Sequence, residues 1–215
     1  MRISLDAKTT VFIGPFSRRG KSRLTLCAMD HDFHPEEKLT PFGLYLPEEN
    51  EVYLFFTSSR ITSDFIVDCL QTFWQHNKWR FPHIETLLIN QDNGPENHSR
   101  RTQFMKRITH FADKFQMAID LAYYPPYHSK YNPIERVWGA LELHWNGSLL
   151  DSIDTVLNFA QTLTWKKRHP VIQWITKNYQ TGVRLTQKAM TLLEQRLERL
   201  PHLPKWFVHI SPVPL

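Results

Sequence analysis

Cysteine is scarce in this sequence, and long apolar runs are absent from it. The only two cysteines, Cys27 and Cys69, lie far apart in a chain of 215 residues. A disulfide framework and a zinc site built from cysteines are therefore excluded. No apolar stretch approaches the roughly 18 residues that a membrane-spanning helix needs, and the first residues contain no apolar signal core. We therefore expect a cytoplasmic protein that does not contact a membrane.

Disorder and low complexity are also excluded, since hydrophobic residues make up 41% and charged residues 22% of the chain, as in globular proteins. The excess of positive charge (26 − 21 = +5) is confined to the last third. Residues 1–150 contain 17 basic and 17 acidic side chains, whereas residues 151–215 contain 9 and 4. This distribution suits a polyanionic partner, but a solvated basic surface gives the same pattern, so charge alone leaves the partner open.

The order of apolar patterns predicts an α/β fold with a central sheet and helices packed against it. We divide the chain into a domain over residues 1–150 and a basic, mostly helical extension over residues 151–215 that ends in a proline-rich tail. Strands are expected at residues 3–7, 10–13, 24–29, 52–57, 86–89 and 117–123, and helices at 64–74, 101–114 and 133–145.

Three carboxylates stand at or near the ends of these elements. Asp6 lies inside the first strand, where a charged side chain is costly unless a partner satisfies it. Asp92 ends a buried strand, at the sheet edge where open α/β sheets bind ligands. Glu135 is the third residue of a helix that Asn132 should cap and Pro133 should begin. Three converging acids of this kind could hold two divalent cations such as Mg²⁺ for phosphodiester chemistry.

Each acid also has a purely structural explanation. Asp6 could pair with Lys8 or with a basic residue of the following loop. Asp92 begins a sequence that is typical of turns. Glu135 occupies the capping-box position, from which it could bond to the backbone of Asn132. Taken one at a time, the residues favour these structural roles at least as well as a catalytic one.

Two longer segments make the combination specific. Residues 90–97 (NQDNGPEN) and residues 124–139 (YPPYHSKYNPIERVWG) resemble the DDE transposases. The similarity is greatest to the ISAzo-type insertion-sequence transposases, which are related to the mariner elements. Further segments similar to that family occur at residues 14–23, 30–33, 39–43, 182–186 and 200–206.

The resemblance implies a ribonuclease-H-like fold of the retroviral-integrase superfamily, with a mixed sheet flanked by helices. By motif match, Asp6, Asp92 and Glu135 are the catalytic and metal-binding acids, which would hold two Mg²⁺ or Mn²⁺ ions. The implied activity is metal-dependent DNA cleavage and strand transfer, with transposon ends and target DNA as partners. Transposases of this kind generally act as dimers, so a homodimer in the bacterial cytosol or nucleoid is expected.

This sequence departs from the family pattern at its start. Family members carry a helical DNA-binding region before the catalytic domain, whereas the first strand here begins within a few residues of Met1. We therefore expect the chain to be the carboxyl-terminal part of a longer transposase.

Six further residues are candidate DNA contacts. Basic side chains would touch phosphates, which position DNA without reading its sequence. His128, just before the helix that bears Glu135, could reach the scissile phosphate or could equally be a loop histidine bonded to backbone. Trp138 and Trp145 are expected in the core. The candidate contacts are Arg18, Arg19, Lys21, Arg23, His128 and Lys130.

Three other functions remain open from the sequence. The first is an inactive transposase remnant that still binds DNA. The second is a ribonuclease-H-like nuclease unrelated to transposition. The third is a nucleic-acid-binding module without enzymatic activity, in which the basic carboxyl-terminal third would be the functional element.

Overall fold

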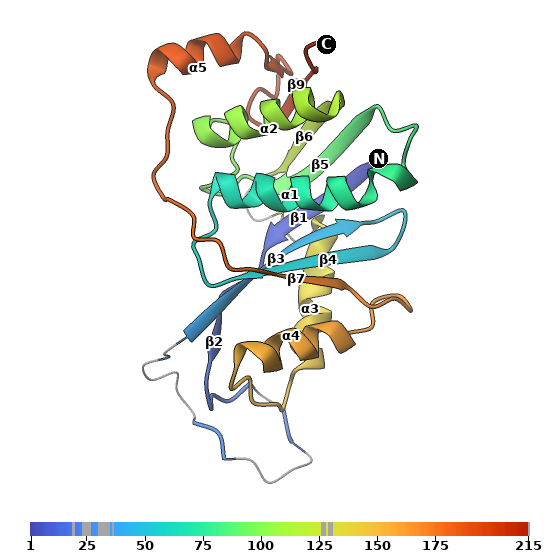
Figure 1. The fold of residues 1–215 in the computed structure, drawn as a ribbon, viewed down its shortest axis with the longest axis vertical. Helices are drawn as coiled ribbons and strands as arrows, with labels where there is room; N and C mark the ends of the chain where they lie inside the picture. Colours follow the sequence, from blue (N-terminus) through green and yellow to red (C-terminus); the bar gives the residue numbers. More distant parts are fainter. Residues whose placement is uncertain are drawn as a thin grey trace.

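The computed structural model describes residues 1–18, 20–22, 27–29, 35, 37–125, 128 and 131–214, and it contains a central mixed sheet with helices on both faces (Figure 1). The strand order is β7-β4-β3-β1-β5-β6-β9-β8, and β2 pairs with β3. The strands are β1 (Arg2–Ala7), β2 (Val11–Ile13), β3 (Glu37–Leu46), β4 (Glu51–Thr57), β5 (Thr86–Asp92), β6 (Ala118–Tyr124), β7 (Val171–Ile175), β8 (Glu198–Arg199) and β9 (Phe207–Ile210). The helices are α1 (Ser63–Asn77), the short 3-10 helix η1 (Lys78–Arg80), α2 (Thr102–Phe115), α3 (Ile134–His144), α4 (Ile153–Thr162) and α5 (Gln187–Glu194). The predicted mixed α/β class is confirmed.

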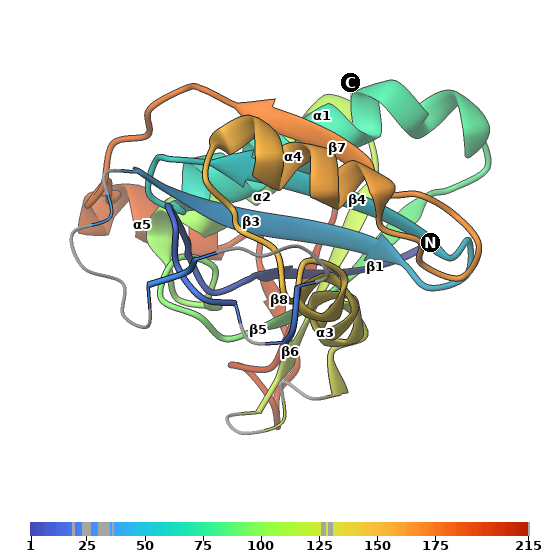
Figure 2. The ribbon, with the colours of Figure 1, turned by 90° about the horizontal axis from the view of Figure 1, so that it is seen from below.

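Helices cover both faces of the sheet, which explains the apolar character of its central strands. Helices α1 and α2 lie on one face, and α3 and α4 lie on the other (Figures 1 and 2). Along β4, Tyr53 and Phe55 pack into the first core, while Val52, Leu54 and Phe56 pack into the second. Because alternate side chains point to opposite faces, a strand buried on both sides reads as one continuous apolar run.

The sequence did not predict β3, which is the longest strand of the sheet. Proline and glycine are depleted in strands, and β3 contains both Pro41 and Gly43. Pro41 has no amide hydrogen to donate, but its carbonyl accepts a hydrogen bond from the Lys8 amide at 2.8 Å. The strand is therefore stabilised by its neighbours β1 and β4 rather than by its own propensity.

The carboxyl-terminal third is less helical than the sequence predicted. Helices α4 and α5 are present, but β7 pairs with β4 and β9 pairs with β6, so this third also extends the central sheet. The last helix of this third is short, since α5 ends at Glu194, and Leu192 within it is 60% exposed. The division of the chain at residue 150 stays a prediction.

A bidentate ion pair ties the carboxyl-terminal third to α2. The guanidinium of Arg196 donates to both carboxylate oxygens of Asp113, at 2.6 and 2.7 Å, and the Val213 amide donates at 2.9 Å. The hydrogen bond from Arg196 is the main cause that lowers the pKa of Asp113. A carboxyl with a lowered pKa contributes stability that is complete above its ordinary pKa and is lost as the pH falls through its folded pKa.

Asp113→Asn is therefore expected to lower the free energy of unfolding by about 1–2 kcal/mol at neutral pH, because it weakens the bonds from Arg196. The loss stays modest because the ion pair is partly exposed. The difference from wild type should shrink as the pH falls below the ordinary range of an aspartic acid. Urea unfolding at about pH 7 and about pH 3 measures both quantities. The exposed Glu85, changed to Gln, is the control. An equal effect of both substitutions, or a difference that does not depend on pH, would show that the ion pair of Asp113 with Arg196 does not stabilise the fold.

Among the helices of the described residues, none is both long enough and apolar enough to cross a membrane.

Candidate active site

The parallel pairing of β1 with β5 brings two of the three acids level with each other. Arg2 pairs with Leu88 and Ser4 pairs with Asn90, which gives a constant offset (88 − 2 = 86; 90 − 4 = 86). The same offset, carried to the ends of both strands, aligns residue 6 with residue 92 (6 + 86 = 92). Asp6 is the penultimate residue of β1 and Asp92 the last residue of β5, so both acids lie at the carboxyl ends of neighbouring strands.

Both acids also point to the same face. Leu5 on β1 and Ile89 on β5 pack into the core beneath α1 and α2. Because strand side chains alternate, Asp6 follows Leu5 onto the opposite face, and Asp92 lies there too, three positions beyond Ile89. This is the face that α3 and α4 cover (Figure 2).

Glu135 reaches this face from the first turn of α3, and a buried asparagine fixes the start of that helix. The Asn132 side chain is 1% exposed, accepts a hydrogen bond from the Ser4 hydroxyl and donates to the Leu5 carbonyl at 3.1 Å. The Ile134 amide donates to the same Ser4 hydroxyl at 3.0 Å. These bonds hold the beginning of α3 against the strand that carries Asp6.

The predicted cap of α3 is wrong in detail. Asn132 was expected to cap the helix, but its side chain is occupied by β1, and Pro133 holds the cap position without a side-chain bond. The helix begins at Ile134, so Glu135 is its second residue rather than its third. The carboxylate still lies in the first turn, where the helix dipole favours a negative charge.

The three carboxylates act on one another electrostatically. The pKa of Asp6 is raised to about 7, first by burial and then by the charges of Asp92 and Glu135. Burial and the charge of Asp92 also raise the pKa of Glu135, against the opposing effect of Lys8. All three side chains are half-buried, so their mutual repulsion is poorly screened while the acids stay accessible from solution.

Among the described residues, the structural roles considered for these acids are not observed. Lys8 pairs with Glu142 of α3 and not with Asp6, so the pairing of Asp6 with Lys8 is wrong, while Arg19 and Arg23 of the following loop lie outside the described residues. Within the part of the chain that the structure describes, the carboxylates of Asp92 and Glu135 have no hydrogen-bond or ion-pair partner. Asp6 receives hydrogen bonds only from the indole of Trp138 and the amide of Ala7 among these residues.

Asn97, rather than Asp92, stabilises the loop that follows β5. Its buried side-chain amide donates to the Gln91 side chain at 2.9 Å and to the Asp92 carbonyl at 3.2 Å. The Tyr123 hydroxyl donates to the carbonyl of Asn97 at 3.0 Å. A Cβ on Gly94 would lie 2.8 Å from the Asn97 side chain, so the tight turn needs glycine there. The Asp92 carboxylate is thus left available for another role.

The chemistry of these side chains fits divalent cations, since Mg²⁺ and Mn²⁺ prefer carboxylate oxygens. Across the described ranges, no group of three or more His, Cys, Asp or Glu side chains is arranged so that it could hold one ion. Mg²⁺ is usually held by one or two carboxylates, with water and phosphate completing its shell. Two of these carboxylates are therefore enough to hold one ion. Every pair among Asp6, Asp92 and Glu135 is electrostatically coupled.

Arg18 and Lys21 lie at the other end of α3 from Glu135. Arg18 lines a surface cavity of about 500 Å³ together with Asn146, and the backbone of Lys21 packs against Gly147. Asn146 follows Glu135 by 11 residues, which at 1.5 Å per residue places it about 16 Å along the helix axis. The structure therefore does not bring Arg18 and Lys21 beside the acids.

His128 lies in the loop before α3. The exposed His128 ring stacks on Tyr131 with ring centres 5.8 Å apart and planes at 21°. Arg19, Arg23 and Lys130 lie outside the described residues, as do residues 30–34. All six assignments as DNA contacts stay predictions.

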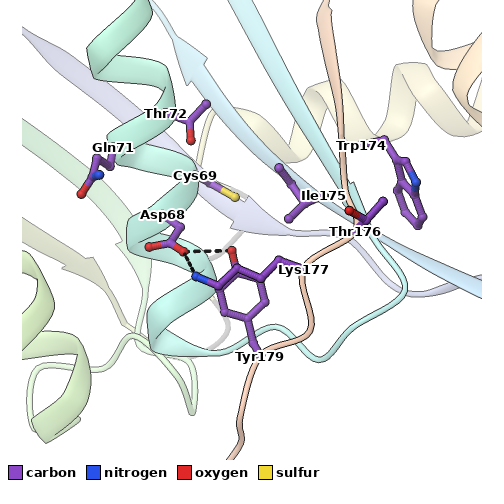
Figure 3. A pocket seen from close by; sticks show the side chains of 9 residues that line it. All are labelled: Asp68, Cys69, Gln71, Thr72, Trp174, Ile175, Thr176, Lys177 and Tyr179. Carbon is purple, nitrogen blue, oxygen red and sulfur yellow. Dashed lines mark hydrogen bonds and ion pairs between the residues drawn. The ribbon is translucent and has the colours of Figure 1, made fainter.

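A separate pocket of about 530 Å³ lies between α1 and the end of β7 (Figure 3). Asp68 points into it and accepts hydrogen bonds from Lys177 at 2.8 Å and from the Tyr179 hydroxyl at 3.0 Å. Arg107 also donates to Asp68, at 2.6 Å. The charges around this pocket are paired with one another, and none of the three acids lines it. This pocket is therefore not the candidate centre.

Known proteins share the sequence pattern and the fold of this chain. A family model described as the Rhodopirellula transposase DDE domain matches residues 1–212, whereas no protein with a curated functional description matches. Two solved complexes of Mos1 transposase, one with the left transposon end and one with Mn, each align with a TM-score of 0.55 at 14% sequence identity.

These alignments cover 74% of this chain but only 46% of the Mos1 chains, so the chain corresponds to less than half of their length. They show that the fold is ribonuclease-H-like, as the sequence predicted. The family match extends over nearly the entire sequence. The chain is therefore a member of the family of transposase DDE domains that the Rhodopirellula model describes.

Proposed function

We propose that this chain is the catalytic domain of a transposase, which cuts DNA at the ends of a mobile element and joins the freed end to target DNA. The observation that supports the proposal is the electrostatic coupling of Asp6 with Asp92 and Glu135, and of Glu135 with Asp92. Membership of the DDE transposase domain family supports it.

Asp6, Asp92 and Glu135 would hold two Mg²⁺ or Mn²⁺ ions. When bound, these ions would supply the charge that activates the attacking oxygen and stabilises the leaving oxygen of a phosphodiester. The protein contributes by fixing the acids on two adjacent strands and a helix that is bonded to one of them. Glu135 stays ionised more readily at the start of α3.

The same carboxylates would serve both reaction steps. Water would first attack the phosphodiester at the end of the element, and the freed 3′-hydroxyl would then attack target DNA from the same position. No covalent bond to the protein is needed for this sequence. Because the acids occupy the edge of a rigid sheet, both nucleophiles would meet the same arrangement of negative side chains.

The proposed partners are transposon-end DNA and target DNA, in the bacterial cytosol or nucleoid. The Mos1 complexes with a similar fold contain a paired end, which supports a homodimer that acts on two ends together. Phosphate contacts would come from basic or polar side chains along the bound DNA, both close to the acids and farther along α3. The candidates are Arg18, Arg19, Lys21, Arg23, His128 and Lys130.

Removal of divalent ions is expected to stop DNA nicking completely. Purified protein should nick supercoiled plasmid in the presence of Mg²⁺ or Mn²⁺, and chelation by EDTA should return the rate to background, because the acids alone supply only negative charge. Gel analysis of nicked and closed plasmid measures this. Cleavage confined to the RNA strand of RNA–DNA hybrids would instead indicate a ribonuclease-H-type nuclease. Metal-independent DNA binding without cleavage would indicate an inactive remnant.

A further inference from the structure

Helix α3 contacts the first acid as well as carrying the third. The indole N–H of Trp138 donates to the Oδ2 atom of Asp6 at 3.2 Å, and the Trp138 side chain is 5% exposed. Trp138 follows Glu135 by three residues, so the two side chains lie on adjacent turns of the same helix face. One rigid element therefore provides Glu135 and a hydrogen-bond donor to Asp6.

A glycine on β3 makes room for this indole. Gly43 pairs with Asp6 across the antiparallel β1–β3 ladder. A Cβ added to Gly43 would lie 2.7 Å from the Cη2 atom of Trp138 and 2.9 Å from the Cδ1 atom of Ile134. Real Cβ atoms do not approach other atoms so closely, so any side chain here would push the indole away from its present position.

A second tryptophan on the same helix provides an internal comparison. Trp145 is fully buried, and its indole N–H donates to Glu142 at 2.8 Å. Glu142 pairs with Lys8 and is not one of the three acids. The two tryptophans thus make the same type of bond from one helix, but only Trp138 bonds to a residue of the candidate centre.

We propose that Trp138, packed over Gly43, is a positioning residue that orients the Asp6 carboxylate for metal binding. This inference rests on the proposed function, since it takes Asp6 to be a metal ligand. A carboxylate whose second oxygen is held by a fixed donor presents its remaining lone pairs in one direction. Hydrogen bonds from outer partners to metal ligands typically change metal affinity by about 10–100-fold.

The test measures Mn²⁺ binding directly, through the electron paramagnetic resonance signal of free Mn²⁺. Trp138→Phe keeps an aromatic ring but removes the N–H, and it should weaken Mn²⁺ binding about tenfold. The Mn²⁺ concentration for half-maximal nicking should rise by the same factor, with little change in the rate at saturating Mn²⁺. Trp145→Phe, the matched control, should bind Mn²⁺ as wild type does.

Gly43→Ala is the second variant, because it displaces the indole without removing any polar group. It should weaken Mn²⁺ binding in the same direction as Trp138→Phe. Thermal unfolding followed by circular dichroism confirms that each variant is folded, and either folded variant decides the question.

The possible results separate this inference from the proposed function. If wild type does not bind Mn²⁺, the metal-dependent function itself is refuted. If wild type binds Mn²⁺ and the folded variants at positions 138 and 43 bind it equally well, the positioning role is overturned while the metal site stands. Equal weakening by Trp138→Phe and Trp145→Phe would also overturn it, since it would reveal a general loosening of α3.

Discussion

Replacement of Asp92 by Asn is expected to abolish metal-dependent DNA nicking and to leave the protein at least as stable as wild type. The Asp92 carboxylate raises the pKa of both Asp6 and Glu135, so it repels them in the folded protein without a bound cation. Its side chain has no partner among the described residues, and no hydrogen bond is therefore lost. Removal of its charge relieves repulsion, which accounts for the unchanged or increased stability.

The loss of activity should be large, because metal ions contribute several kcal/mol to the transition state of phosphoryl transfer. A loss of that size corresponds to a decrease in rate of about 10³-fold or more. Plasmid nicking in Mg²⁺ measures the rate, and urea unfolding without metal measures the stability of the same preparation. Opposite changes in the two quantities distinguish a catalytic acid from a structural one.

Asp120→Asn is the matched control for this experiment. Asp120 lies on β6, pairs in register with Leu88 of β5, and bonds to His209 at 2.6 Å. Its replacement should keep the nicking activity and lower the stability modestly. Nicking at the wild-type rate by folded Asp92→Asn would remove Asp92 from the active site.

Asn132→Ala is expected to cause the largest loss of stability among the substitutions considered. The side chain is 1% exposed, and it satisfies both the Ser4 hydroxyl and the Leu5 carbonyl. The Ser4 hydroxyl keeps the bond from the Ile134 amide, so the substitution removes two buried hydrogen bonds, and the free energy of unfolding should fall by about 1–3 kcal/mol. Activity should fall as well, because α3 would lose its attachment beside Asp6.

Asn146→Ala is the matched control. Asn146 follows the end of α3 and is exposed, so the same substitution removes no buried hydrogen bond there. Asn146→Ala should change the free energy of unfolding by no more than about 0.5 kcal/mol. Urea unfolding of both variants measures the difference. Similar small effects at the two positions would show that Asn132 does not anchor the helix.

The candidate acids could be identified from the sequence because local pattern and motif agreed. The apolar run of β5 indicated a buried strand that ends at Asp92, and the resemblance selected Asp6 and Glu135 from many other acids. Helix α1 was also predictable, since its buried residues recur at helical spacing. In each case the residues that decide the structure are close together in the sequence.

The features that the sequence did not reveal depend on distant partners. Asn132 has the sequence context of a helix cap, but its side chain bonds to Ser4, which lies 128 residues away. Gly43 disfavours a strand in isolation and is explained only by the indole of Trp138. The partner of β7 lies more than 100 residues earlier in β4. Local propensity cannot report such contacts, because tertiary packing overrides it.

The position of β9 has a consequence for synthesis of the protein. Strand β9 covers the outer edge of β6, yet its residues leave the ribosome long after β1, β5 and α3 have been made. Until then, the backbone amides and carbonyls along that side of β6 lack their partner, and an open strand edge readily pairs with another chain. A polypeptide released before residue 207 would thus contain the three acids together with an unpaired edge of β6. That exposed edge favours aggregation of incomplete copies.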